Sequence, residues 1–242
     1  MLEASNSDSR AKNAINDKRL RSYILRQGRM TSLQQKGIDE FLPILGCNLE
    51  DGLIQPTQLF PQAGPLVLEI GFGMGASLLE QAQALPDHNF IGIEVHEPGV
   101  GKLLCEAGTL GLKNLRVFHT DAVKVLEEAI PDHSLDLVQI FFPDPWHKKK
   151  HQKRRLVQPP LVQLISQKLK PEGKIHLATD WQDYAEHMLE VLQAEPSLHN
   201  TSTTNTYVER PASRPLTKFE QRGERLGHGV WDLIFQKLNH YK

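Results

Sequence analysis

Apolar segments of two lengths alternate through most of the chain. Short apolar runs bounded by glycine or acidic residues are typical of buried strands, and longer segments with apolar positions every three or four residues are typical of helices. The predicted strands are residues 65–70, 89–94, 115–119, 135–142, 173–178 and 230–238. The predicted helices are residues 77–84, 98–110, 122–129, 159–169 and 181–194. This alternation favours βαβ units and a mainly parallel sheet in a doubly wound α/β fold.

The length and composition suit one large domain with extensions. The chain has 242 residues, of which 39% are apolar. We expect residues 31–242 to form this domain, with a loop rich in Ser, Thr, Asn and Pro at 195–214, and residues 1–30 to form a basic, partly disordered arm. Residues 10–36 carry eight Lys or Arg, so the arm either orders on a partner or is simply disordered. The mixed apolar and basic residues at 23–30 favour docking of that part.

The sequence gives no indication of export, membrane insertion or metal binding. The polar N-terminus lacks the apolar segment of a secretion signal, and no run approaches the roughly 18 to 20 apolar residues that span a bilayer. We therefore expect a cytoplasmic protein without membrane contact. Cys47 and Cys105 are isolated, which argues against a disulfide framework or a zinc site. His147 and His151 have helical spacing, but the flanking cations would repel a metal ion and no third ligand is evident.

Residues 139–155 join a buried strand, one acid between two prolines, and a cationic run. Residues 147–155 include six Lys or Arg, although the whole chain has 28 Lys plus Arg against 29 Asp plus Glu. An isolated charge run is as often a solvated loop as a binding site. In a chain without overall basic bias, however, this clustering indicates a local site for a polyanion such as nucleic acid.

The glycine cluster at residues 69–75 (EIGFGMG) ends a strand and opens a helix. Glycine there removes the Cβ that would keep a ligand away from the backbone. Glu94 closes the next strand, where a carboxylate can accept hydrogen bonds from ribose hydroxyls. The third glycine comes one residue earlier than in a dinucleotide site, and Glu69 would repel a pyrophosphate but attract an ammonium group. These features favour S-adenosylmethionine as the ligand.

Four acids, Glu69, Glu94, Asp121 and Asp144, end four successive predicted strands. In a doubly wound sheet the carboxyl ends of the strands meet at one crevice, so we expect the four carboxylates to converge. Asp121 suits either the adenine amine or the N-cap of the next helix, and the two roles are compatible. Prolines on both sides hold Asp144 in a restricted backbone. Trp146 either stacks on a base or packs in the core.

Four segments in order, residues 69–75 (EIGFGMG), 142–148 (FPDPWHK), 217–225 (TKFEQRGER) and 230–235 (VWDLIF), resemble the bacterial tRNA (guanine-N7-)-methyltransferases. The resemblance runs from about residue 21 to the end of the chain. It implies a Rossmann-like fold of about seven mostly parallel strands with an antiparallel strand near the C-terminus. It also implies S-adenosylmethionine as cofactor and N7 of a guanine in the tRNA variable loop as the site of methylation.

The resemblance further implies roles for individual residues. The four acids and Gly71, Gly73 and Gly75 would bind the cofactor, with Asp144 also central to catalysis. Substrate contacts would come from Lys148, Asp180, Thr217, Lys218, Phe219 and Glu220. RNA would run over Lys150, His151, Gln152, Lys153, Arg154 and Arg155. By its sequence alone, the segment from Thr217 to Glu220 also fits a capping box that begins a helix.

Guanine N7 has an in-plane lone pair, so methyl transfer needs no general base and positioning should dominate. We expect Asp144 and Asp180 to orient the purine and to stabilise its developing positive charge. Three other functions are alternatives. The strongest is a nucleic-acid methyltransferase that acts on an exocyclic amine. A nicotinamide dehydrogenase is disfavoured by the early third glycine and by Glu69. A noncatalytic RNA-binding module would leave the four acids unexplained. The sequence leaves open whether the protein is a monomer or a homodimer.

Overall fold

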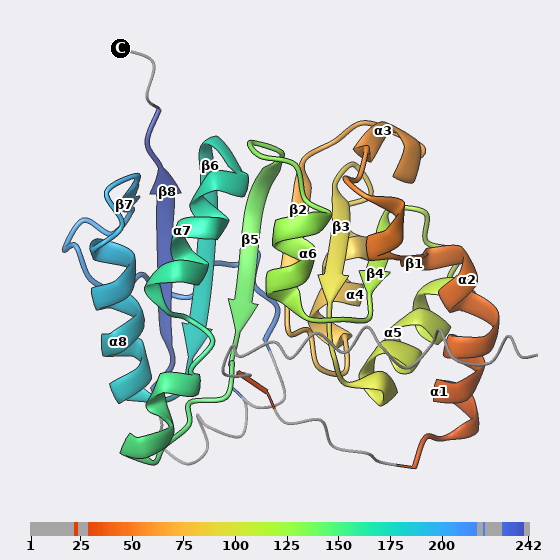
Figure 1. Ribbon diagram of the computed structural model, residues 1–242, viewed down its shortest axis with the longest axis horizontal. Helices are drawn as coiled ribbons and strands as arrows, with labels where there is room; N and C mark the ends of the chain where they lie inside the picture. Colours follow the sequence, from red (N-terminus) through yellow and green to blue (C-terminus); the bar gives the residue numbers. More distant parts are fainter. Residues whose placement is uncertain (1–21, 24–28, 217–219, 221–228, 240–242) are drawn as a thin grey trace, which may run out of the picture.

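The structure is a computed structural model that describes residues 22–23, 29–216, 220 and 229–239. In this part of the chain, one eight-stranded sheet has the order β1-β4-β3-β2-β5-β6-β8-β7 (Figure 1). The strands are β1 (Gly46–Cys47), β2 (Leu66–Ile70), β3 (Asn89–Ile93), β4 (Leu115–Phe118), β5 (Leu135–Phe141), β6 (Leu169–Thr179), β7 (Leu198–Asn200) and β8 (Trp231–Lys237). β8 is antiparallel to both β6 and β7, and the other neighbours are parallel. The predicted Rossmann-like α/β fold is confirmed.

Helices cover both faces of the sheet, and each face has its own apolar core. The helices that connect the strands are α4 (Ala76–Ala84), α5 (Glu97–Thr109), α6 (Ala122–Glu128), α7 (Pro159–Lys168) and α8 (Gln182–Gln193). α6, α7 and α8 lie in front of the sheet in Figure 1, where they pack on alternate strand residues such as Leu68 and Ile140. α4 and α5 pack on the other face, against residues such as Val67 and Phe90. The sheet therefore lies between two layers of helices.

The sequence patterns missed the short elements. Among the described residues, β1 pairs only with β4. β7 lies inside the segment 195–214, which the sequence predicts as a loop, and among the same residues it pairs only with β8. A strand of two or three residues is too short to show a period. Before β1 lie α1 (Ser32–Lys36), η1 (Gly37–Phe41) and α2 (Leu42–Leu45), and α3 (Pro56–Leu59) precedes β2. α1 buries no residue, so no apolar stripe marks it, although Thr31 and Gln34 form a capping box at its start.

The direction of the connections reverses between β2 and β5. β2 pairs with β3 on one side and with β5 on the other. After β2 the chain adds β3 and β4 towards one edge of the sheet, and from β5 onwards it adds strands towards the other edge. The helices that follow β2 and β5 therefore leave on opposite faces and do not close over the carboxyl ends of these strands. Such a switch point is where doubly wound sheets bind ligands.

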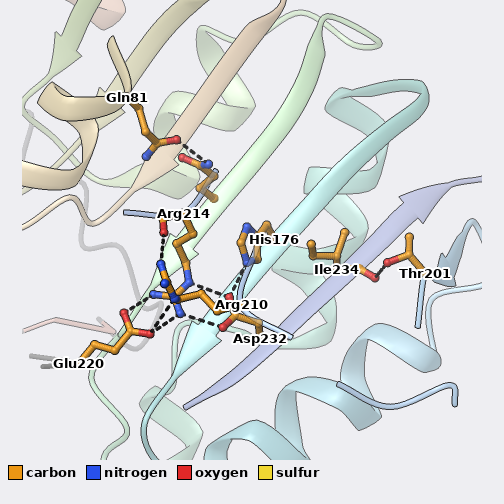
Figure 2. Close-up of polar contacts among 9 residues, drawn as sticks. Gln81, His176, Thr201, Arg210, Arg214, Glu220, Asp232 and Ile234 are labelled. Carbon is orange, nitrogen blue, oxygen red and sulfur yellow. Dashed lines mark hydrogen bonds and ion pairs between the residues drawn. The ribbon is translucent and has the colours of Figure 1, made fainter. Parts of the chain in front are cut away.

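A buried ion-pair network fixes the C-terminal strands to this edge of the sheet. The guanidinium of Arg214 is fully buried and lies between Glu220 and Asp232, with His176 beyond Asp232 (Figure 2). It donates two hydrogen bonds of 2.7 Å to Glu220 and two, of 2.7 and 2.8 Å, to Asp232. His176 Nε2 lies 2.7 Å from Asp232 Oδ1, the oxygen that also accepts from Arg214 Nε. Burial opposes the charge of Asp232, but the hydrogen bonds from His176 and Arg214 hold its pKa below its usual range.

The same guanidinium also contacts the end of β5. Its carbon atom lies 5.8 Å from the centre of the Phe141 ring and 5.6 Å from the centre of the Phe142 ring. Arg214 therefore joins β6, β8 and the residue Glu220 to the point where β5 leaves the sheet. The buried cation therefore also packs against the start of the loop after β5.

Replacement of Arg214 tests how much the network stabilises the fold. Arg214→Ala would leave two buried carboxylates without their cation, so we expect the free energy of unfolding to fall by about 3 to 5 kcal/mol. Arg214→Lys should cost less but remain clearly destabilising, because an ammonium group lacks the planar fork that binds two carboxylates. Urea unfolding followed by circular dichroism measures both.

Arg210 supplies the matched control for this prediction. Its side chain is 40% exposed and its Nε lies 3.8 Å from Glu220. Arg210→Lys should therefore change the stability by less than about 1 kcal/mol. Equal stabilities of Arg214→Ala and Arg210→Lys would show that the buried carboxylates do not depend on Arg214.

Candidate active site

A cavity of about 430 Å³ lies at the switch point, beyond the carboxyl ends of β2, β3, β4 and β5. Its lining includes Glu94, Asp121 and Asp144, three of the four strand-end acids. Glu69 does not line it. The structure therefore brings three of the predicted carboxylates together at one site and leaves the fourth inside the sheet.

The glycine turn between β2 and α4 forms one wall of the cavity. Gly71 and Gly73 line the cavity with φ of +75° and +58°, in the left-handed region that other residues rarely adopt. A Cβ at either position would meet no atom within 4 Å, so the wall here is bare backbone facing open space. Gly75 has a different role, because its Cβ would lie 2.7 Å from Cβ of Leu103 in α5. It lets α4 begin close to α5, and a cofactor contact by Gly75 stays a prediction.

Glu94 holds this glycine turn in place. Its Oε2 accepts a hydrogen bond of 2.8 Å from the backbone N–H of Gly73, and its Oε1 accepts from the backbone of Val95 and His96 at 2.7 and 2.9 Å. A carboxylate has about four acceptor positions in total. Three of them serve the protein, so Glu94 has room for about one hydroxyl donor and not for two full bonds to a ribose.

Asp121 combines the two roles that the sequence left open. Its Oδ1 accepts hydrogen bonds from the backbone N–H groups of Val123 and Lys124 at 3.0 and 3.3 Å, which caps α6. Asp121 also lines the cavity. Because both capping bonds use Oδ1, the second oxygen remains for a ligand.

Glu69 lies in the core on the face opposite the cavity-lining Ile70. Strand residues alternate between faces, so Glu69 shares the side of Val67, beneath α4. It is 3% exposed and stands next to Gln139 of β5 in the register of the sheet. Gln139 donates a 2.9 Å hydrogen bond to Gln81 of α4. Glu69 Oε2 and Gln139 Oε1 have no hydrogen-bond partner within the described part of the chain.

Glu69 consequently favours its neutral form. Burial raises the pKa of its carboxyl to about 8, and repulsion from Glu94 contributes to the rise. A proton also turns one carboxyl oxygen into a donor, which suits a site where acceptors are in excess. Its expected contact with the cofactor remains a prediction.

The loop after β5 carries Asp144 to the surface at the rim of the cavity. Phe142 and Trp146 have φ of +51° and +46°, which are strained values for bulky residues. The backbone N–H of Phe142 still donates to Ala178 at 2.8 Å, and that of Trp146 donates to Asp144 Oδ1 at 3.0 Å. Asp144 is exposed. The loop therefore fixes the backbone around this acid while its side chain faces solvent and the cavity.

Trp146 packs inside the protein and does not offer a free face. Its side chain is 8% exposed, and the guanidinium carbon of Arg154 lies 4.1 Å from the centre of its ring. Its Nε1 donates a 3.1 Å hydrogen bond to the backbone oxygen of Ser22, and His151 contacts it edge-on. The sequence left open whether Trp146 stacks on a base or packs in the core, and the structure supports packing.

The cationic segment divides into an outer and an inner group. Its helical turn η3 (Lys149–Arg154) follows Lys148, and the exposed residues are Lys148, Lys149, Lys150 and Lys153. His151 and Gln152 are half-buried, and Gln152 donates a 3.1 Å hydrogen bond to Asp183. The four lysines form the part of this surface that can reach a phosphate. Direct RNA contacts by these residues remain predictions.

Arg155 belongs to the inner group, and its expected contact with RNA stays a prediction. It is 4% exposed, forms an ion pair with Asp183, and donates a 3.0 Å hydrogen bond to the backbone oxygen of Pro145. Its guanidinium also lies over the ring of Tyr184. These contacts fix the cationic segment to the first turn of α8, so the role that the structure supports for Arg155 is positional.

The expected substrate residues are only partly described. Asp180 is exposed directly after β6. Glu220 is 2% exposed, and both of its carboxylate oxygens accept hydrogen bonds from Arg214. This geometry does not support a direct contact between Glu220 and the substrate. Thr217, Lys218 and Phe219 lie outside the described residues, as does the capping box that they would begin.

Some cavity residues gave no usable signal in the sequence. Ser22 and Tyr23 line the cavity, so a part of the predicted N-terminal arm lies against the site. His96 and Leu156 line it as well, from the segments after β3 and after the cationic turn. Loop residues of this kind come together only through the tertiary fold. Over the described ranges, no group of three or more metal-binding side chains occurs and no helix is long and apolar enough to cross a membrane.

The raised pKa of Glu69 predicts a pH dependence of stability. Above its ordinary pKa of 4.5 the unfolded chain releases this proton, whereas the folded protein keeps it up to about pH 8. Stability should therefore fall as pH rises across this interval, by roughly 1 kcal/mol per pH unit from this group. Glu69→Gln should remove that slope in denaturant unfolding at about pH 5, 6.5 and 8, whereas Glu80→Gln, at an exposed site of α4, should not. Parallel curves for wild type and Glu69→Gln would contradict the assignment.

The sequence of this chain is similar to curated bacterial enzymes over most of its length. A family model described as "Putative methyltransferase" matches residues 63–233. The tRNA (guanine-N(7)-)-methyltransferase of Shewanella amazonensis is 58% identical over 221 residues, which cover 91% of this chain and 93% of that protein. The enzymes of the same name from Yersinia enterocolitica and Pseudomonas syringae are 57% and 54% identical, covering 91% and 92% of this chain and 92% and 91% of those proteins.

Solved structures show the same fold at much lower identity. The 16S rRNA methyltransferase KamB has a TM-score of 0.56 at 17% identity, covering 76% of this chain and 92% of that one. A 16S rRNA (adenine(1408)-N(1))-methyltransferase from Catenulisporales acidiphilia has a TM-score of 0.54 at 13% identity, covering 81% and 94%. Because the curated relatives match at more than half of all positions along nearly the whole chain, the chain belongs to the family of the tRNA (guanine-N(7)-)-methyltransferases.

Proposed function

We propose that this protein transfers a methyl group from S-adenosylmethionine to N7 of a guanine in tRNA and so forms 7-methylguanosine. The names of the 54 to 58% identical relatives support the reaction and the class of RNA. The structural observation that carries the proposal is the position of Asp144. It lines the cavity at the switch point and also begins the loop that leads into the exposed lysines. A tRNA substrate also agrees with the cytoplasmic location expected from the sequence.

The cavity suits S-adenosylmethionine in its charge and in its open backbone wall. Glu94 and Asp121 each keep an acceptor position free, and we assign these to a ribose hydroxyl and to the adenine amine. The bare backbone at Gly71 and Gly73 leaves room for the body of the ligand. A contact between the cofactor's ammonium group and Glu69 stays a prediction from the sequence, because the Glu69 carboxyl is buried on the face away from the cavity. When bound, the cofactor supplies an electrophilic methyl group on a sulfonium.

The chain itself supplies position and negative potential. N7 attacks with its own lone pair, so no residue has to remove a proton from it. The purine gains positive charge as the methyl arrives, and the exposed carboxylates of Asp144 and Asp180 can stabilise this charge. They can also accept hydrogen bonds from guanine N1–H and the exocyclic amine. The hydrogen bond from the backbone N–H of Trp146 restrains the Asp144 carboxylate, which suits such an orienting role.

The outer lysines offer a binding site for the RNA backbone. Phosphate contacts fix the register of an RNA without reading its sequence. Choice of one guanine must therefore come from the shape of the tRNA and from the access of a loop base to the cavity. The chain has a formal net charge of -1, so this local surface and not the overall charge must attract the RNA.

One experiment tests cofactor, substrate and product together. Incubation with labelled S-adenosylmethionine and an unmodified tRNA transcript, followed by nucleoside mass spectrometry, should yield 7-methylguanosine in the variable loop. A label found on an exocyclic amine would instead support the other class of nucleic-acid methyltransferase. No transfer of label, with RNA binding retained, would support a noncatalytic RNA-binding protein.

The role of Asp144 predicts a loss of rate without a loss of fold. Asp144→Asn keeps an oxygen that can accept from the Trp146 backbone but removes the charge, so we expect the turnover number to fall by about 100-fold to 1000-fold. The dissociation constant for tRNA should change by only a few fold. Asp87→Asn, which neutralises an acid in the turn before β3, should leave the rate unchanged. A near wild-type rate for Asp144→Asn with unchanged cofactor affinity would refute the assignment.

The outer lysines predict a change in the salt dependence of tRNA binding. The pair Lys149→Gln and Lys150→Gln should weaken binding and reduce the slope of log affinity against log salt by roughly 1.5, since each lost phosphate contact removes about 0.7 to 0.9. Lys113→Gln with Lys174→Gln removes the same charge from exposed lysines near the amino ends of the strands. If both pairs lower the slope equally, the effect comes from total charge and not from contact at η3.

A further inference from the structure

Trp181 occupies an exposed position that the fold itself does not explain. Of the large apolar side chains that the described part of the chain exposes, Trp181 is the only aromatic one, at 40%. It stands at the N-cap of α8, where its side chain makes no capping hydrogen bond. Ser, Thr, Asp and Asn are the residues that stabilise this position, and an indole adds nothing to it. Neither the core nor the helix accounts for a tryptophan here.

The surroundings of Trp181 connect the cavity rim to the cationic segment. The His147 ring lies 4.1 Å from the Trp181 ring between their centres, at an interplanar angle of 72°. His147 follows Asp144 by three residues on the loop after β5. On the other side, Arg155 and Gln152 both bind Asp183 in the first turn of α8. Trp181 therefore lies between the acid at the end of β5 and the turn that bears the lysines.

The chemistry around Trp181 suits a base better than a phosphate. Asp180 precedes it directly and is exposed, and negative charge there would repel a phosphate. A nucleobase carries no charge, offers N–H groups to carboxylates at its edge, and stacks on an indole through its face. An edge-on contact from His147 covers at most one face of the indole ring. Trp146, the other tryptophan of this region, has no such freedom because Arg154 covers it.

We propose that Trp181 is a stacking residue for an unpaired base of the RNA substrate. This inference rests on the proposed function, and it assigns one recognition element to the surface between Asp180 and His147. Outer lysines bind the backbone of the RNA, and Trp181 binds an exposed base next to the acids. A helical RNA keeps its bases stacked inside, so this contact distinguishes an open loop from a duplex.

The test compares Trp181→Ala and Trp181→Phe with wild type, using an unmodified tRNA transcript and a fully paired RNA duplex. Loss of base stacking weakens binding by about 5-fold to 150-fold for alanine replacements. Trp181→Ala should show such a loss for the tRNA only, and Trp181→Phe should recover most of it because a benzene ring also stacks. Affinity for S-adenosylmethionine and the melting temperature should not change. Ile44→Ala, at another exposed apolar site, should bind both RNAs as wild type does.

The turnover number and KM of Trp181→Ala show which base is stacked. If Trp181 holds the reacting guanine, the turnover number of Trp181→Ala falls together with affinity; if it holds a neighbouring base, KM rises alone. Both results support stacking. Unchanged tRNA affinity of Trp181→Ala would overturn the proposal, and so would an equal loss for the duplex, a loss of cofactor affinity, or no recovery in Trp181→Phe.

Failure of the proposed function would look different. A wild-type protein that binds tRNA without forming 7-methylguanosine would remove the reaction but leave the binding comparison intact. If wild type and Trp181→Ala formed 7-methylguanosine equally well, the reaction would stand and the stacking role would be refuted.

Discussion

The strands β2 and β5 lie side by side, but the chain leaves them in opposite directions, because β2 is followed by β3 on one side and β5 by β6 on the other. Helices α4 and α7, which follow these two strands, therefore cover different faces, and the space beyond the strand ends stays open. Everything that concerns function depends on this constraint. The glycine turn, the three cavity-lining acids and the loop of Asp144 all occupy that space because they directly follow strands that meet there.

Buried charge is handled in three different ways around this edge of the sheet. Backbone N–H groups satisfy Glu94, and in doing so they fix the glycine turn. A guanidinium satisfies Asp232 and Glu220 together, and its contact with Phe142 ties the C-terminal part of the sheet to the loop of Asp144. Glu69 has neither solution, so burial favours its proton. Within the described residues, the burial of Glu69 is therefore a cost that no cation offsets.

The cationic segment shows how one stretch of similar residues serves two purposes. Its lysines remain in solvent, where a flexible ammonium group can follow a phosphate. Its arginines turn inward: Arg155 pairs with Asp183, and Arg154 lies over Trp146. The arginines thereby hold the turn that bears the lysines against α8 and Trp146. With Trp146 covered in this way, Trp181 remains as the exposed aromatic ring of the region.

The sequence by itself determined the core strands and helices, the glycine turn, and the acids at the strand ends, because periodicity and turn chemistry are local properties. Its motifs also determined the family. Only the tertiary structure decided that Glu69 faces away from the cavity, that Arg155 and Glu220 are buried in ion pairs, and that Trp146 is covered while Trp181 is exposed. The reason is that burial of one polar side chain depends on partners far along the chain, such as Asp183 for Arg155 and Arg214 for Asp232. No local pattern records those partners.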